Sequence, residues 1–114
     1  MRKIFLLAIV VLALASCETQ QTLYSWYNSE DATYQYTKRL TDDKLKDAIK
    51  QYDRVVKKQR GVRKAVPPGA NAEYGFLLYK TGNKEEGISL LKAEIESYPE
   101  SEIFISRIIK QLEK

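Results

Sequence analysis

The fold is decided between residues 68 and 101, which read PGANAEYGFLLYKTGNKEEGISLLKAEIESYPES. The spacing of apolar residues predicts two helices here, one from about Asn71 to Lys80 and one from Lys84 to about Tyr98. The turn between them is Thr81-Gly82-Asn83, and Pro99 ends the second helix. We therefore expect two antiparallel helices joined by a tight turn.

Two glycines in this stretch stand where the two helices would cross. Gly75 lies in the first helix and Gly87 in the second, and helix backbones approach closely only where side chains are small. Leu78 and Leu91 are large apolar residues suited to the core between them. The length of 34 residues and these positions resemble one tetratricopeptide repeat, although Asn71 stands where that repeat usually has leucine or an aromatic residue.

Three more helices are predicted, two before this pair and one after it. One covers about residues 29–40, and the next runs from an N-cap at Thr41 to a terminating Gly61. The last is capped by Ser101. No segment alternates apolar and polar residues as a half-buried strand does, so we expect an all-α fold. The apolar stripe of the last helix consists of Ile105, Ile108, Ile109 and Leu112.

The first half of the chain carries a weaker copy of the same spacing. Ala48, Tyr52 and Val55 are spaced like residues 87, 91 and 94, at an offset of 39 residues instead of 34. The additional residues fall in the segment Val62 to Pro68. The sequence thus predicts two tetratricopeptide-like helical hairpins and a C-terminal capping helix, in one domain over residues 24–114.

Residues 1–16 have the layout of a cleaved secretory signal. Arg2 and Lys3 precede an apolar run from Ile4 to Ala15, which is shorter than the roughly 20 residues that span a bilayer. Cleavage would lower the formal net charge from +4 to +2, because the two basic residues leave with the signal. The working protein is therefore expected to be only weakly basic.

Cys17 is the one cysteine of the chain, and it directly follows Leu14-Ala15-Ser16. This sequence resembles a lipobox, in which cleavage occurs before a cysteine that carries acyl chains. The alternative is an ordinary signal that leaves a free thiol. We predict membrane attachment through acylated Cys17 and a tether over residues 17–23. Glu18 is not the aspartate that retains lipoproteins in the inner membrane of enteric bacteria, which favours the outer membrane. Residues 18–21 contain only one acid, which favours the periplasmic face over surface display.

The composition excludes several kinds of chemistry. The chain has no histidine and one cysteine, so histidine-based triads, intrachain disulfides and thiolate metal clusters are excluded. The acidic pairs Asp42-Asp43 and Glu85-Glu86 are adjacent residues in first helical turns, which do not face each other as a catalytic pair would. We expect a protein that is not an enzyme and that has no metal, cofactor or small-molecule substrate.

Two surfaces are candidates for protein binding. Aromatic residues crowd between Tyr24 and Tyr36, where they either pack the first helix of the domain or bind a partner. Trp26 and Tyr27 are the candidate binding residues of this group. The resemblance to tetratricopeptide repeats implies a groove lined by Ala72, Phe76, Tyr79 and Lys80, unless the last helix covers it.

A basic cluster lies between the two hairpins. It either meets anionic lipid or an acidic partner, or complements the dipole of a helix end. Interleaved aromatic residues are absent from it, so we expect no nucleic acid partner. Its members are Lys57, Lys58, Arg60, Arg63 and Lys64.

These motifs together resemble a family of small bacterial lipoproteins known by a domain of unknown function, the 4810 type. The resemblance implies that the gene for this chain lies beside a gene for a lipoprotein similar to the curli-secretion channel. It thus implies that the chain is an adaptor or accessory subunit of an outer-membrane lipoprotein assembly. The alternative function is a structural or regulatory factor in envelope or peptidoglycan assembly. The shared elements are the lipobox, residues 24–27 (YSWY), 34–36 (YQY), 66–69 (VPPG), 75–79 (GFLLY) and 98–101 (YPES).

Overall fold

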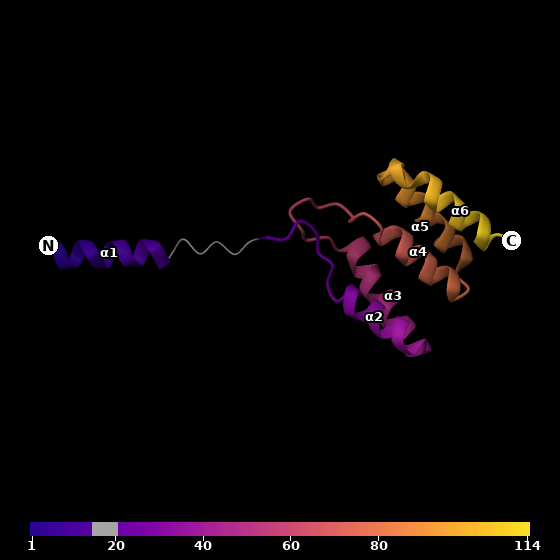
Figure 1. Ribbon diagram of the computed structural model, residues 1–114, viewed down its shortest axis with the longest axis horizontal. Coiled ribbons are helices and arrows are strands. Elements are labelled where there is room, and N and C mark those ends of the chain that lie inside the picture. Colours follow the sequence, from indigo (N-terminus) through magenta and orange to yellow (C-terminus); the bar gives the residue numbers. More distant parts are fainter. Residues whose placement is uncertain (15–20) are drawn as a thin grey trace.

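The computed structural model describes residues 1–14 and 21–114, so the predictions made for Cys17 lie outside the described residues. The first helix, α1 (Arg2–Leu14), is drawn apart from the others in Figure 1. None of the helices in the described ranges is both long enough and apolar enough to cross a membrane. Within the described part of the predicted signal, Arg2–Leu14 form one short helix.

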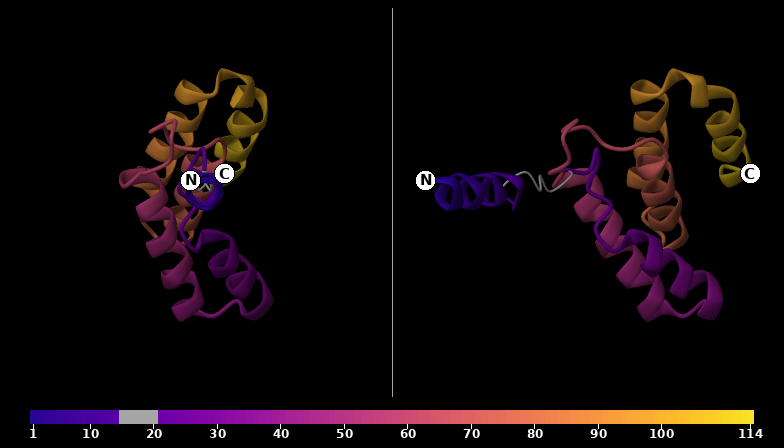
Figure 2. Two further views of the ribbon diagram at one scale, coloured as in Figure 1. Left: turned by 90° about the vertical axis from the view of Figure 1, so that its left-hand side faces the viewer. Right: turned by 60° about the vertical axis from the view of Figure 1, so that its left-hand side comes forward.

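All regular secondary structure in the described part of the chain is helical and none of it is strand, which confirms the all-α prediction. In the right-hand view of Figure 2, α4 and α5 stand between the α2–α3 pair and α6. The contacts agree with this view, because α3 packs on α4 and α5 packs on α6. After α1 the elements are α2 (Ser29–Arg39), α3 (Asp42–Lys57), α4 (Ala70–Lys80), α5 (Lys84–Ser97), the 3-10 turn η1 (Pro99–Ser101) and α6 (Glu102–Leu112).

Helix α3 ends earlier than the sequence predicts. The expected terminator was Gly61, but the helix stops at Lys57 and Lys58 is its C-cap. Gly61 has another role, since a Cβ atom there would collide with backbone atoms of Leu23 and Tyr24. The glycine lets the chain before α2 lie directly against the loop after α3.

We call this N-terminal segment, residues 22–25, the strap. The amide of Val62 donates to the carbonyl oxygen of Thr22 at 3.0 Å. The side-chain amide of Gln59 donates to the carbonyl oxygen of Ser25 at 2.8 Å, and its Oε1 accepts from the amide of Ser25 at 3.0 Å. Thr22 and Leu23, at the end of the predicted tether, are therefore held against the helical domain.

Helices α4 and α5 cross at the two glycines, as predicted. A Cβ atom on Gly75 would stand 2.5 Å from the carbonyl oxygen of Gly87, and one on Gly87 would stand 2.6 Å from that of Gly75. Leu91 is fully buried beside this crossing. The close approach of two backbones makes α4–α5 the most extensive helix pair of the chain.

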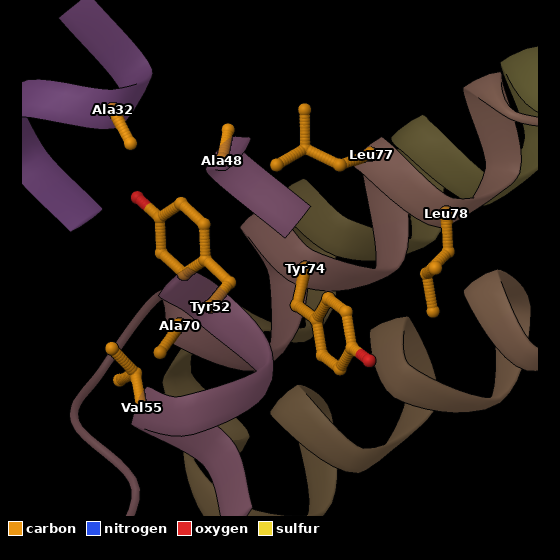
Figure 3. Close-up of a cluster of buried hydrophobic side chains, with 8 residues drawn as sticks. All are labelled: Ala32, Ala48, Tyr52, Val55, Ala70, Tyr74, Leu77 and Leu78. Atoms are coloured by element: carbon orange, nitrogen blue, oxygen red, sulfur yellow. The ribbon is translucent and has the colours of Figure 1, made fainter. Parts of the chain in front are cut away.

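The core joins three helices (Figure 3). Tyr74 of α4 donates its hydroxyl to Asp53 Oδ1 of α3 at 2.7 Å, so the polar edge of the core is satisfied as well. Lys57 also pairs with Asp53, and these two hydrogen bonds lower the pKa of the Asp53 carboxyl below its ordinary value. The buried cluster consists of Ala32, Ala48, Tyr52, Val55, Ala70, Tyr74, Leu77 and Leu78.

Helix α6 buries less of its predicted stripe than expected. Ile105 is 2% exposed, but Ile108, Ile109 and Leu112 are only half-buried. Phe104 lies outside the stripe and remains 67% exposed. The last helix therefore covers its neighbours incompletely and leaves apolar surface open to solvent.

A substitution of Leu40, the C-cap of α2, is expected to stabilise the hairpin of α2 and α3. Its φ of 49° is left-handed, and its side chain is 71% exposed. A Leu40→Gly variant is expected to gain about 0.5–1 kcal/mol in free energy of unfolding, because glycine adopts this conformation without strain. Urea denaturation followed by circular dichroism measures the gain. Leu40→Ala keeps the strain, so an equal gain in that control would contradict the explanation.

Candidate binding groove

The aromatic residues near the strap divide between core and surface. Trp26, Tyr27 and Tyr36 are half-buried and pack on the core cluster. The hydroxyl of Tyr27 donates to the carbonyl oxygen of Lys58 and the Arg54 guanidinium lies 4.2 Å from its ring centroid. Most of these rings therefore pack α2 onto the domain, and Tyr27 is engaged within the chain on both its hydroxyl and its face.

The four residues predicted to line a groove on α4 have different surroundings. Ala72 and Phe76 line an open hollow between α4 and α6. Tyr79 instead donates its hydroxyl to the carbonyl oxygen of Leu112 at 2.6 Å, which ties α4 to the end of α6. The ammonium of Lys80 lies 5.2 Å from the ring centroid of Phe76. The last helix thus covers part of this surface and leaves the rest as a groove.

The groove consists of two hollows that share Ala72, Glu73 and Phe104. The apolar hollow has a volume of about 360 Å³, and Phe76, Leu91, Gln111, Ile108 and Leu112 complete its walls. The second, which we call the acidic–aromatic hollow, measures about 550 Å³. It is lined by Trp26, Tyr52, Pro68, Gly69, Ala72, Glu73, Glu94, Tyr98, Glu100, Ser101, Phe104 and Ile105.

Three carboxyl groups and no basic side chain line the acidic–aromatic hollow. Glu94 is only 2% exposed, and its Oε1 accepts the amide of Gly69 at 2.6 Å. Its Oε2 has no hydrogen-bond partner among the described residues. Within residues 1–14 and 21–114, no group of acidic residues, cysteine or histidine could hold a metal ion.

The tyrosines of this hollow are neutral hydrogen-bonding groups. Burial raises the pKa of the Tyr52 hydroxyl above its ordinary value, although a hydrogen bond with Thr33 opposes the shift. Burial and a hydrogen bond with Tyr24 raise the pKa of Tyr98, whose hydroxyl donates to the carbonyl oxygen of Val66 at 2.5 Å. At neutral pH the hydroxyl groups of Tyr52 and Tyr98 are therefore neutral and add no negative charge to the hollow.

The basic cluster lies beside the strap. Lys57 and Lys58 stand at the C-terminal end of α3, where the helix dipole favours cations. Arg60 and Arg63 follow in the loop that the strap covers, and the Arg63 guanidinium hydrogen-bonds the Tyr24 hydroxyl at 3.2 Å. The helix dipole therefore accounts for the position of Lys57 and Lys58, but not for that of the loop arginines, Arg60 and Arg63.

Sequence reasoning missed two important residues of the groove. Phe104 stands one turn before Ile108, at the edge of the apolar stripe of its helix, and a large aromatic residue that widens the stripe beyond its predicted members is a detectable signal. Glu94 occupies the position that corresponds to Val55 in the first hairpin, and both are buried. A glutamate at an apolar repeat position was the second signal available.

Comparisons with known proteins identify one family. Residues 23–108 match the family model described as "Domain of unknown function (DUF4810)", which confirms the resemblance to the 4810 type. Neither the comparison with curated proteins nor that with solved structures gave a match.

Proposed function

The chain belongs to the DUF4810 family, and we propose that it is a lipid-anchored adaptor that holds a partner protein at the periplasmic face of the outer membrane. The observation that carries the proposal is the groove between α4 and α6. Phe104 stands 67% exposed at the point where the two hollows meet. Exposed aromatic residues beside a concave surface are typical anchors of protein interfaces.

The arrangement of the helices supports binding on this face. We include in the proposal that the α4–α5 hairpin is tetratricopeptide-like, because the crossing at Gly75 and Gly87 and the burial of Leu91 follow that pattern. The α2–α3 hairpin is proposed as a weaker copy, since Ala48, Tyr52 and Val55 are buried. Helical repeats form curved stacks that bind partners on their concave surfaces. Two hairpins with a partly covering α6 suit a subunit that completes its surface with another protein.

The strap gives the proposed anchor a short reach. If Cys17 carries the lipid, only residues 18–21 separate it from Thr22, and the five residue-to-residue steps between them span at most about 18 Å. The loop arginines of the basic cluster would then lie near the anionic headgroups, which adds electrostatic attraction. Confinement to the membrane raises the effective concentration of the groove for other lipoproteins there.

Two substitutions test the lipid anchor and the groove separately. Cys17→Ala is expected to release at least about tenfold more of the exported chain from membranes, since most of the apolar attachment is lost. Phe104→Glu is expected to remain in the membrane fraction but to lose the partner that the acylated parent retains through detergent purification. Immunoblotting of fractions and mass spectrometry of purified complexes measure the two effects.

Tyr34→Glu is the control for the groove variant, because Tyr34 is an exposed aromatic residue that lines neither of the two hollows of the groove. A Cys17→Ala chain that stays in the membrane would refute the lipid anchor. A partner retained by Phe104→Glu would refute the groove. Recovery of a lipoprotein similar to the curli-secretion channel supports the adaptor, whereas a peptidoglycan synthase favours the alternative role in envelope assembly.

A further inference from the structure

The acidic–aromatic hollow combines two kinds of group that bind cations. Its four aromatic rings include the one tryptophan of the chain, and aromatic faces attract ammonium and guanidinium groups within about 6 Å. Its three glutamates provide negative charge, and no lysine or arginine is among the lining residues. This sign is opposite to that of the whole chain, which has 19 basic and 15 acidic residues.

Glu94 provides an independent indication of a ligand. Its carboxyl group is almost completely buried, yet only Oε1 has a donor, the amide of Gly69. Oε2 has none among the residues that the structure describes. A buried carboxylate oxygen without a partner destabilises the folded chain, so a donor from a ligand would remove a cost that folding leaves in place.

We infer that the acidic–aromatic hollow binds an arginine or lysine side chain of the partner protein. The aliphatic stem of that side chain lies against Ala72 and Phe104, and its cationic head faces the Trp26 ring and the carboxyl group of Glu94. Oε2 is enclosed in the unbound chain, so the Glu94 side chain turns toward the hollow to accept the donor. The inference rests on the proposed function, since the same groove must accept a partner.

A polypeptide fits the site better than a small free cation. The apolar hollow continues directly from the acidic–aromatic one through Ala72, Glu73 and Phe104. Apolar residues next to the basic one would occupy it in the same binding event. The recognised element is therefore a basic residue flanked by apolar residues, which supplies charge to one hollow and apolar area to the other.

The single tryptophan makes this inference measurable. Its indole N–H gives one resonance in a ¹⁵N–¹H correlation spectrum of the full chain in detergent micelles. The probes are two acetylated and amidated tripeptides, Leu-Arg-Leu and Leu-Gln-Leu, which differ only in the cation. The arginine peptide is expected to shift the Trp26 resonance and to bind about tenfold more tightly than the glutamine peptide.

Glu94→Gln is expected to abolish this preference, because an amide presents a neutral side chain to the guanidinium. Glu73→Gln is expected to reduce the preference by about two- to threefold, since Glu73 is exposed and its charge is screened. Glu85→Gln, an exposed position on α5 outside the groove, is the matched control and should retain it. The dispersion of each spectrum shows that the variant is folded.

The other outcomes distinguish this inference from the proposed function. Equal binding of the two peptides would overturn the cation site and leave the groove in place. No response of Trp26 to either peptide would overturn both. A preference that survives Glu94→Gln would overturn the role of Glu94. A Trp26 resonance that moves with protein concentration alone, and stops doing so in Glu94→Gln, would make a second copy the occupant and overturn a separate partner.

Discussion

A Gly87→Ala variant is expected to lose about 1–3 kcal/mol in free energy of unfolding. The added methyl group would stand 2.6 Å from the carbonyl oxygen of Gly75 and 2.9 Å from the backbone amide nitrogen of Tyr79. Both obstacles are backbone atoms of α4, so relief requires the two helices to move apart. Such a shift would loosen the packing of Leu91, which is fully buried.

The sign of this effect is informative because helix propensity predicts the opposite. Alanine is better than glycine inside a helix by about 1 kcal/mol, so without the crossing Gly87→Ala would stabilise α5. Ser89→Ala is the matched control, since it places alanine at an exposed position of the same helix and is expected to stabilise slightly. Urea denaturation followed by circular dichroism compares both variants with the parent. A Gly87→Ala chain as stable as the Ser89→Ala chain would show that the helices do not require this contact.

The helices were predictable because local signals and packing agree in them. The turn at Gly82 has a φ of 95° that glycine adopts freely, and Pro99 begins the 3-10 turn that follows α5. Gly75 and Gly87 could be assigned to a helix crossing because no other feature of an amphipathic helix calls for glycine there. These residues determine α4 and α5 through interactions that lie close together in sequence.

The end of α3 was not predictable, because its cause lies far away in the sequence. Glycine is a residue type that commonly ends helices, but the role of Gly61 is to accommodate the strap at Leu23 and Tyr24. The loop amide of Val62 bonds to Thr22 for the same reason. Contacts between segments about forty residues apart leave no periodic pattern that a reading of one stretch can detect.

The candidate site was predicted in part. Ala72 and Phe76 do line a groove, as the resemblance to helical repeats implied, and Trp26 lines the neighbouring hollow. Tyr79 and Lys80 instead make contacts within the chain, with Leu112 and with two aromatic rings. The sequence could not show how far α6 covers α4, because coverage depends on the angle between them and not on the stripe of either helix.

Glu94 is expected to show different costs for two substitutions. Glu94→Ala should lose about 2–3 kcal/mol in free energy of unfolding, because it leaves the half-buried amide of Gly69 without its acceptor and removes a buried side chain beside α4. The carboxyl group also stands at the N-terminal end of α4, where negative charge is favourable. Glu94→Gln keeps an acceptor for Gly69 and should stay within about 1 kcal/mol of the parent.

The pair separates what Glu94 does for the fold from what it does for a ligand. The fold needs one acceptor oxygen, which glutamine also supplies. The second oxygen has no partner among the described side chains and backbone amides, so it brings the folded chain no hydrogen bond. If stability required the carboxylate itself, Glu94→Gln would be as damaging as Glu94→Ala in urea denaturation. A Glu94→Gln chain that is folded and stable, yet no longer distinguishes arginine from glutamine, assigns the charge of Glu94 to binding.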